Sequence, residues 1–174
     1  MALENFKKES LDEVHKKEAI NQVMQLNAGS AQKAELVLII LGIKPSTELS
    51  LFPWNSTQEE AERILLSTGL NFVKKDKPLW EKASVEYAIS NNPELVQKLL
   101  QPTTSAEYGR LMGYPESAIE AFESEKTYEG ILPEDIENSI FRLKFSQDHF
   151  NQEFEVVRKW NEAIRNYAPE LLEQ

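Results

Sequence analysis

Three segments of the chain have the spacing of a helix capping box, in which a Ser or Thr precedes a Glu by three residues. In this motif the hydroxyl accepts a hydrogen bond from a backbone N–H of the first helical turn, and the carboxylate reaches back to the N–H of the cap residue. The three segments are Ser10-Leu-Asp-Glu13, Ser56-Thr-Gln-Glu59 and Thr104-Ser-Ala-Glu107. Asn92-Pro93 adds a fourth helix start, with Asn as the cap and Pro at the first helical position. The chain is therefore predicted to be rich in helices.

Apolar residues at helical spacing follow these starts, and Gly or Pro residues mark the ends. We expect one helix between Ser10 and Gly29, with Gly29 as a left-handed stop, and another from Ser56 to Gly69. Further helices are expected at 92–101, at 104–113, from 115 through 122, at 133–135 as a short helix or turn, and from Ser146 to Ala168.

Four segments have residues typical of strands. The apolar run from Leu36 to Leu41 suits a buried strand or the end of a helix, and we favour the strand. Residues 71–75 and 83–90 flank an Asp76-Lys-Pro78 turn and are predicted to pair as antiparallel strands. Residues 139–145 alternate in polarity and are predicted to form a strand. The expected fold is a single α+β domain over residues 1–174, helix-rich with a small sheet; the alternative is an all-α fold.

The composition excludes several classes of site. The chain has no cysteine, so disulfides, thiolate metal sites and thiol nucleophiles are ruled out. No cofactor is implied by any motif, because neither a Walker-type loop nor a Gly-x-Gly-x-x-Gly turn is present. The first residues lack the apolar stretch of a signal peptide, and the longest apolar run is too short to cross a bilayer. A cytoplasmic location without membrane attachment is expected.

The formal net charge is −10, and most of it comes from residues 116–137, where eight acidic residues are opposed only by Lys126. A surface of this charge repels phosphate groups, so we expect no binding of nucleic acid or anionic membranes. A helix-corner-helix pattern at 104–123 is similar to a DNA-binding motif, but its second helix carries carboxylates where phosphates would lie. The simpler interpretation is a solvated acidic helix face.

Residues 107–116 combine two glycines, two tyrosines and Arg110 around one helix corner. Gly109 inside a helix costs about 1 kcal/mol relative to Ala, which indicates a close approach by another helix or by a ligand. We expect packing, and we keep Arg110 and Tyr114 as candidate ligand-binding residues. The motif Met112-Gly-Tyr-Pro-Glu116, with Gly42-Ile-Lys-Pro45 upstream, resembles an uncharacterised prokaryotic family known as a domain of unknown function. Its members carry cysteines after the motif, whereas Ser117 and Ala118 stand here, so the resemblance implies no activity.

A second constellation lies at the expected start of the last helix. His149 and Glu153 are one helical turn apart, and Asp148 precedes them. Such spacing offers two ligands to a divalent metal, but a second His motif is missing, so we expect no metal site. We favour the simpler explanation, in which Asp148 complements the positive end of the helix dipole and a neutral His149 caps or packs.

Two aromatic residues, Phe52 and Trp54, flank Pro53 in an expected loop, where they plug the core, line a pocket or anchor an interface. Two classes of function remain. The first is a non-catalytic binding or interaction domain, as a homo-oligomer or with a protein partner. The second is a small enzyme or ligand-binding protein with a cleft around Arg110 and Tyr114 and around Asp148, His149 and Glu153.

Overall fold

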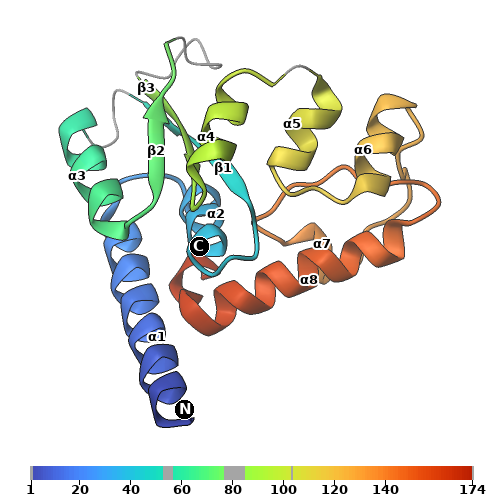
Figure 1. The fold of residues 1–174 in the computed structure, drawn as a ribbon. Helices are drawn as coiled ribbons and strands as arrows, with labels where there is room; N and C mark the ends of the chain where they lie inside the picture. The colour runs from blue at the N-terminus through green and yellow to red at the C-terminus, as the bar shows by residue number, and fades with distance from the viewer. Residues whose placement is uncertain (1, 53–56, 77–84, 103, 174) are drawn as a thin grey trace.

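The computed structural model describes residues 2–52, 57–76, 85–102 and 104–173, with side chains from residue 12 onward. Figure 1 shows a small sheet with helices on both sides. This confirms the predicted α+β class and excludes the all-α alternative. The elements are, in order, α1 (Ala2–Gln25), α2 (Ser30–Ile40), β1 (Ser46–Leu51), α3 (Gln58–Thr68), β2 (Asn71–Lys74), β3 (Val85–Ser90), α4 (Pro93–Leu100), α5 (Ser105–Leu111), α6 (Glu116–Glu123), α7 (Glu134–Glu137), α8 (Phe150–Tyr167) and the 3-10 helix η1 (Pro169–Leu171).

The sheet has the strand order β1-β3-β2, and both pairs are antiparallel. The predicted pairing of β2 with β3 is confirmed, since Asn71 lies opposite Ser90 and Lys74 lies opposite Tyr87. The predicted turn at Lys77 and Pro78 lies outside the described residues. β1 is not among the predicted strands, although residues 46–51 alternate in polarity.

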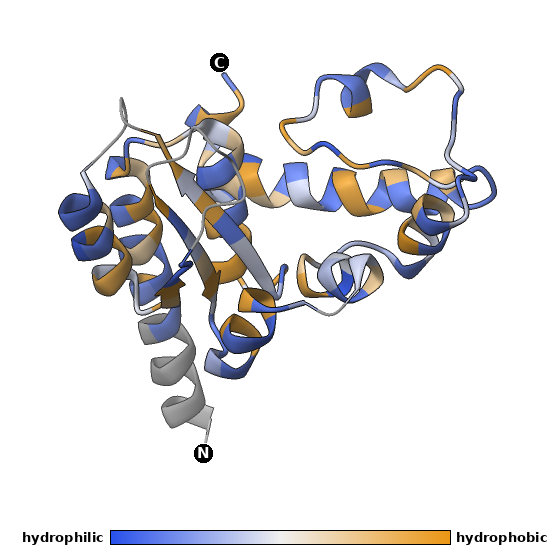
Figure 2. Cartoon of the chain, turned by 90° about the horizontal axis from the view of Figure 1, so that it is seen from above, coloured by the Kyte–Doolittle hydropathy of each residue, from blue (hydrophilic) through white to orange (hydrophobic). Residues whose placement is uncertain are grey.

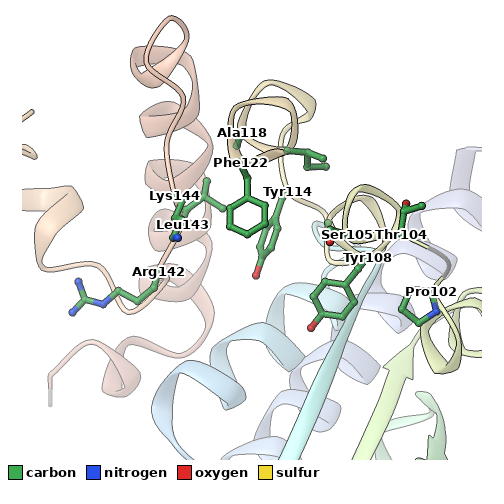
Figure 3. Close-up of a pocket in the computed structure, with 12 residues that line it drawn as sticks. Pro102, Thr104, Ser105, Tyr108, Tyr114, Ala118, Phe122, Arg142, Leu143 and Lys144 are labelled. Carbon is green, nitrogen blue, oxygen red and sulfur yellow. The ribbon is translucent and has the colours of Figure 1, made fainter. Parts of the chain in front are cut away.

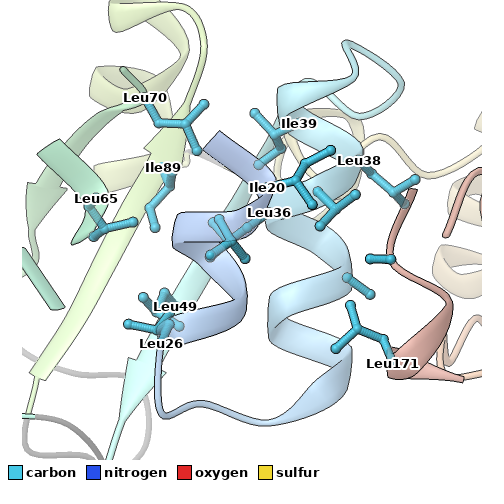
Figure 4. Close-up of a cluster of buried hydrophobic side chains, with 14 of the residues drawn as sticks. Ile20, Leu26, Leu36, Leu38, Ile39, Leu49, Leu65, Leu70, Ile89 and Leu171 are labelled. Atoms are coloured by element: carbon cyan, nitrogen blue, oxygen red, sulfur yellow. The ribbon is translucent and has the colours of Figure 1, made fainter. Parts of the chain in front are cut away.

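One face of the sheet is apolar and carries the main core. Leu49, Tyr87 and Ile89 point to this face and are fully buried. They pack against apolar side chains of α1, α2 and α3, and Figure 4 shows Leu49 and Ile89 in this core. The C-terminal η1 closes the same core with Leu171. Burial of this apolar surface is the main contribution to the stability of the fold.

The other face of the sheet is largely polar and is covered by α4 and α5. Ser46 donates a hydrogen bond to the carbonyl of Leu111 on α5 at 2.5 Å. Ser50 donates to the buried carboxylate of Glu86 on the neighbouring strand at 3.0 Å. Since buried polar groups require partners, these side chains determine which helices can cover this face.

The helix starts are mostly where the sequence places them. Asn92 accepts from the N–H of Glu94, and Thr104 accepts from that of Glu107, so both caps are confirmed. The helix predicted from Ser56 is capped by Thr57 and ends at Gly69, whose φ is 74°. Apolar residues recur at helical spacing along α8, as expected, and Figure 2 shows them as orange bands between blue ones. The helix ends before Ala168–Pro169.

The strand predicted at Leu36–Leu41 is wrong, because residues 36–40 form the C-terminal half of α2 and Leu41 is its C-cap. Leu36, Val37, Leu38 and Ile39 are all fully buried. α2 is in contact with α1, β1, α8 and η1, so its C-terminal half has no solvent-exposed face. A helix that is covered on every side has no apolar stripe, and periodicity cannot distinguish it from a buried strand.

The strand predicted at 139–145 is also wrong, although its alternation is real. Phe141 and Phe145 are buried, while Arg142 and Lys144 are exposed. Among the described residues the segment pairs with no strand; an isolated bridge joins Ser146 to Thr127. Alternation reports which side of an extended backbone is buried, and it does not report whether the backbone pairs with a neighbour.

The first helix was placed too late in the chain. α1 begins at Ala2, so the box at 10–13 lies inside the helix, and α1 ends at Gln25 before Gly29 is reached. Gly29 has a φ of −62° and instead forms the N-cap of α2, where its N–H donates to the Gln32 side chain. The ordinary φ at Gly29 shows that the residue is not a left-handed stop.

The corner between α5 and α6 is a Schellman turn. Gly113 has a φ of 75°, its N–H donates to the carbonyl of Arg110, and the N–H of Tyr114 donates to the carbonyl of Gly109. A Cβ atom on Gly113 would lie 2.6 Å from Cδ of Pro45. The segments 42–45 and 112–116 therefore touch each other at this corner.

Replacing Gly113 by Ala should destabilise the fold for two reasons, the left-handed backbone and the contact with Pro45. Gly69→Ala is the matched control, since Gly69 has a similar φ of 74° and no heavy atom within 4 Å of the added Cβ. We expect a loss of about 1 kcal/mol for the control and about 1–3 kcal/mol more for Gly113→Ala, measured by urea unfolding. Equal losses would show that the contact with Pro45 is unimportant.

Candidate ligand cavity

A cavity of about 700 Å³ lies between α5, α6 and the extended segment 142–144. Figure 3 shows the residues that line it. Three of them are aromatic, Tyr108 on α5, Tyr114 at the corner and Phe122 on α6. The lining also holds Arg142 and Lys144, and none of its described residues is a His or a carboxylate.

Tyr108 connects the cavity to the polar face of the sheet. Thr104 caps α5, and Tyr108 follows one turn later with its ring directed towards β1 (Figure 3). Its hydroxyl donates to Oε2 of Glu48 at 2.9 Å. Burial raises the pKa of the Tyr108 hydroxyl, and the charge of Glu48 raises it further. Tyr108 is therefore a neutral phenol at physiological pH.

Tyr114 forms a second part of the wall, with its hydroxyl directed away from Phe122 towards the sheet side (Figure 3). Burial, followed by the charges of Glu35 and Glu48, raises the pKa of its hydroxyl to about 12. Within the described part of the chain this hydroxyl has no hydrogen-bond partner. It is thus a protonated group that is free to donate to a molecule in the cavity.

The buried ammonium of Lys44 lies over the ring of Tyr114. The Lys44 side chain is fully buried, and its ammonium forms an ion pair with Glu35 on α2 at 2.9 Å. The same ammonium lies 5.4 Å from the centroid of the Tyr114 ring and 5.0 Å from that of Trp160 on α8. A cation over an aromatic face is attracted by the ring electrons. Thr47 completes the cluster by donating to Glu35.

A second group of buried charges lies on the polar face of the sheet, behind Tyr108. The ammonium of Lys75 is 2.5 Å from Oε1 of Glu48 and 3.6 Å from Oε2 of Glu86. Both carboxylates have further partners, Tyr108 for Glu48 and Ser50 for Glu86. Burying a charged group is costly unless it is paired and hydrogen-bonded, as these groups are. The two carboxylates near the tyrosines are therefore compensated by the protein itself.

The candidate residues from the sequence do not gather around this cavity, except for Tyr114. Arg110 lies on an exposed face and forms an ion pair with Glu116, which is likewise exposed. This pairing raises the pKa of Arg110 and lowers that of Glu116. Asp148 and His149 are also exposed and lie outside the lining. The geometry does not form the single cleft that an enzyme using all these residues would need.

Glu153 has a different environment from its neighbours. It is buried, with an exposed fraction of 1%. Its carboxylate accepts from the N–H of Ser146 at 2.6 Å, from the Ser146 hydroxyl at 2.7 Å and from the Ser117 hydroxyl at 2.5 Å. The sequence predicts Ser146 as the cap of α8, but the N-cap residue is His149. The Ser146 hydroxyl instead accepts a hydrogen bond from the backbone N–H of His149. Glu153 thereby ties α6 to the start of α8.

The remaining candidates are the loop aromatics and a metal site. Phe52 is half-buried, and Trp54 lies outside the described residues. No cluster of three or more His, Cys, Asp or Glu side chains suited to a metal occurs in the ranges that the structure covers. None of the helices in those ranges is long and apolar enough to cross a membrane.

The residues that sequence reasoning missed are Lys44, Glu48, Glu86 and Lys75. A signal for Glu48 was present, since 46–51 alternates between polar residues and Thr47, Leu49 and Leu51. That alternation is typical of a strand with one polar face.

Comparisons with protein-family models, curated proteins and solved structures found no match. The function has to be argued from the site itself.

The raised pKa of Tyr114 predicts a specific loss of stability at alkaline pH. The folded chain holds this proton up to about pH 12, whereas the unfolded chain releases it near pH 10. The contribution to stability is present below the unfolded pKa and is lost as the pH rises through the folded one. Between these values, the free energy of unfolding should fall more steeply with pH for the wild type than for Tyr114→Phe. Urea unfolding over this pH range tests the difference, and equal slopes would contradict it.

Proposed function

We propose that this protein is a non-catalytic binding protein whose ligand is a small molecule with an aromatic or apolar body, held between α5, α6 and segment 142–144. The proposal is supported by the composition of the lining, in which the rings of Tyr108, Tyr114 and Phe122 surround a cavity with few polar groups. Ligand sites in proteins are mostly cavities of about 300–1,000 Å³ with this composition. The volume of about 700 Å³ lies within that range.

Binding is favoured over catalysis by the groups that the lining provides. General acid–base catalysis uses a group whose pKa is near the working pH. Both tyrosines have a raised pKa and stay protonated, and the described lining contains no carboxylate or imidazole. The Tyr114 hydroxyl can donate a hydrogen bond, and Tyr108, which donates to Glu48, can accept one. A pair of this kind orients a polar edge of a ligand without transferring a proton. The expected homo-oligomer or protein partner stays a prediction.

Removing the aromatic ring of Phe122 tests this proposal, because that side chain is 51% exposed and its loss leaves the core unchanged. The neutral compound naphthamide should bind the wild type saturably at one site. Phe122→Ala should weaken this binding about five-fold, since an aromatic contact contributes about 1 kcal/mol. Isothermal titration calorimetry measures both.

Leu66→Ala is the matched control, because Leu66 is a 70% exposed apolar residue of α3 outside the lining. Its affinity for naphthamide should equal that of the wild type. Absence of saturable binding, or equal weakening by both substitutions, would contradict the proposed site.

A further inference from the structure

The charges around the cavity are distributed unevenly, although the chain as a whole is acidic. The two charged residues in the described lining are both basic, Arg142 and Lys144. α6 contributes Ala118, Ile119 and Phe122 to the lining. Its acidic residues lie on another face, where Glu116, Glu120 and Glu123 act together on the pKa of Arg110. The helical spacing of these two sets of residues keeps them on different sides of α6.

Lys144 is the cation that is best placed to meet a ligand. Its ammonium lies 5.1 Å from the centroid of the Phe122 ring, at the exposed wall of the cavity. Among the described residues it has no carboxylate or hydrogen-bond partner. Arg142, in contrast, already has a partner, because its guanidinium donates a hydrogen bond to the carbonyl of Glu137 at 2.9 Å. Its side chain points away from the tyrosines in Figure 3. Lys144 is therefore an unpaired donor beside an aromatic surface.

The opposite end of the cavity has the opposite polarity. Glu35 and Glu48 lie behind the tyrosine hydroxyls, and their charges act on the Tyr114 hydroxyl. An anionic group would find no unpaired cation there, because Lys44 is paired with Glu35 and Lys75 with Glu48, and it would be attracted towards Lys144 instead. A cationic group would meet the ammonium of Lys144 over Phe122. Two like charges in contact repel each other, so a cationic ligand is disfavoured against the ring of Phe122.

We infer that the ligand is an aromatic monoanion, such as an aryl carboxylate, whose ring lies against Phe122 and Tyr114 and whose anionic group is bound by the ammonium of Lys144. This inference rests on the proposed function, and it adds the charge and the orientation of the ligand. The neutral, polar edge of the ligand faces the hydroxyls of Tyr108 and Tyr114. The anionic end lies at the outer wall formed by Lys144 and Phe122.

Three compounds with one ring system separate the alternatives at neutral pH. Naphthoate is an anion, naphthamide is neutral, and naphthylmethylamine is a cation. Calorimetric titration of the full chain at low ionic strength should show naphthoate binding about five-fold more tightly than naphthamide, as expected for one partly exposed ion pair. The amine should bind most weakly. The preference for naphthoate should decrease with added salt, because exposed charges are screened.

Lys144→Gln should abolish the preference for naphthoate over naphthamide. Lys159→Gln is the matched control, because it removes the same charge from an exposed residue of α8 outside the lining and should retain the preference. If naphthamide binds at this site as tightly as naphthoate, the inference fails while the proposed function stands. Tighter binding of the amine, or a preference for naphthoate that persists in Lys144→Gln, would likewise overturn it. Failure of all three compounds to bind would refute the proposed function itself.

Discussion

Burial of the Lys44 ammonium is the constraint around which the regions of this protein are arranged. Removing an ammonium from water costs several kcal/mol, and the cost is recovered only when the partners are close and well oriented. Here the partners are Glu35 on α2, the ring of Tyr114 at the α5–α6 corner and the ring of Trp160 on α8. Three segments that are distant in sequence must therefore meet at one point. The contact of Gly113 with Pro45 brings the corner to the same place.

The polar face of the sheet extends this arrangement towards the cavity. Side chains such as Ser46 and Glu48 are enclosed between the sheet and α5, so each requires a hydrogen-bond partner there. Leu111 provides a carbonyl for Ser46, and Tyr108 provides a hydroxyl for Glu48. These bonds fix α5 over the sheet, while Glu153 fixes α6 against α8 through Ser117. The cavity is the space left between two helices that are held from different sides.

Local chemistry predicted much of the fold, and tertiary contacts determined what it could not predict. Caps such as Asn92 and Thr104 act within a single helical turn, so sequence spacing is enough to locate them. Burial of α2 on all sides, in contrast, depends on elements elsewhere in the chain, and the run from Leu36 to Leu41 carries no trace of them. The site followed the same pattern: Tyr114 was found through its motif, whereas Lys44, which supports it, is a single residue without a local signature.

A double-mutant cycle on Lys44 and Glu35 is the most direct test of the role given to the buried ion pair. Lys44→Met keeps the side-chain volume but leaves Glu35 without its cation, and urea unfolding should show a loss of about 3 kcal/mol. Adding Glu35→Gln removes the unpaired charge, so the double variant should be destabilised by less than the sum of the two single losses. Losses below about 0.5 kcal/mol that simply add would contradict the view that this pair holds α2, the corner and α8 together.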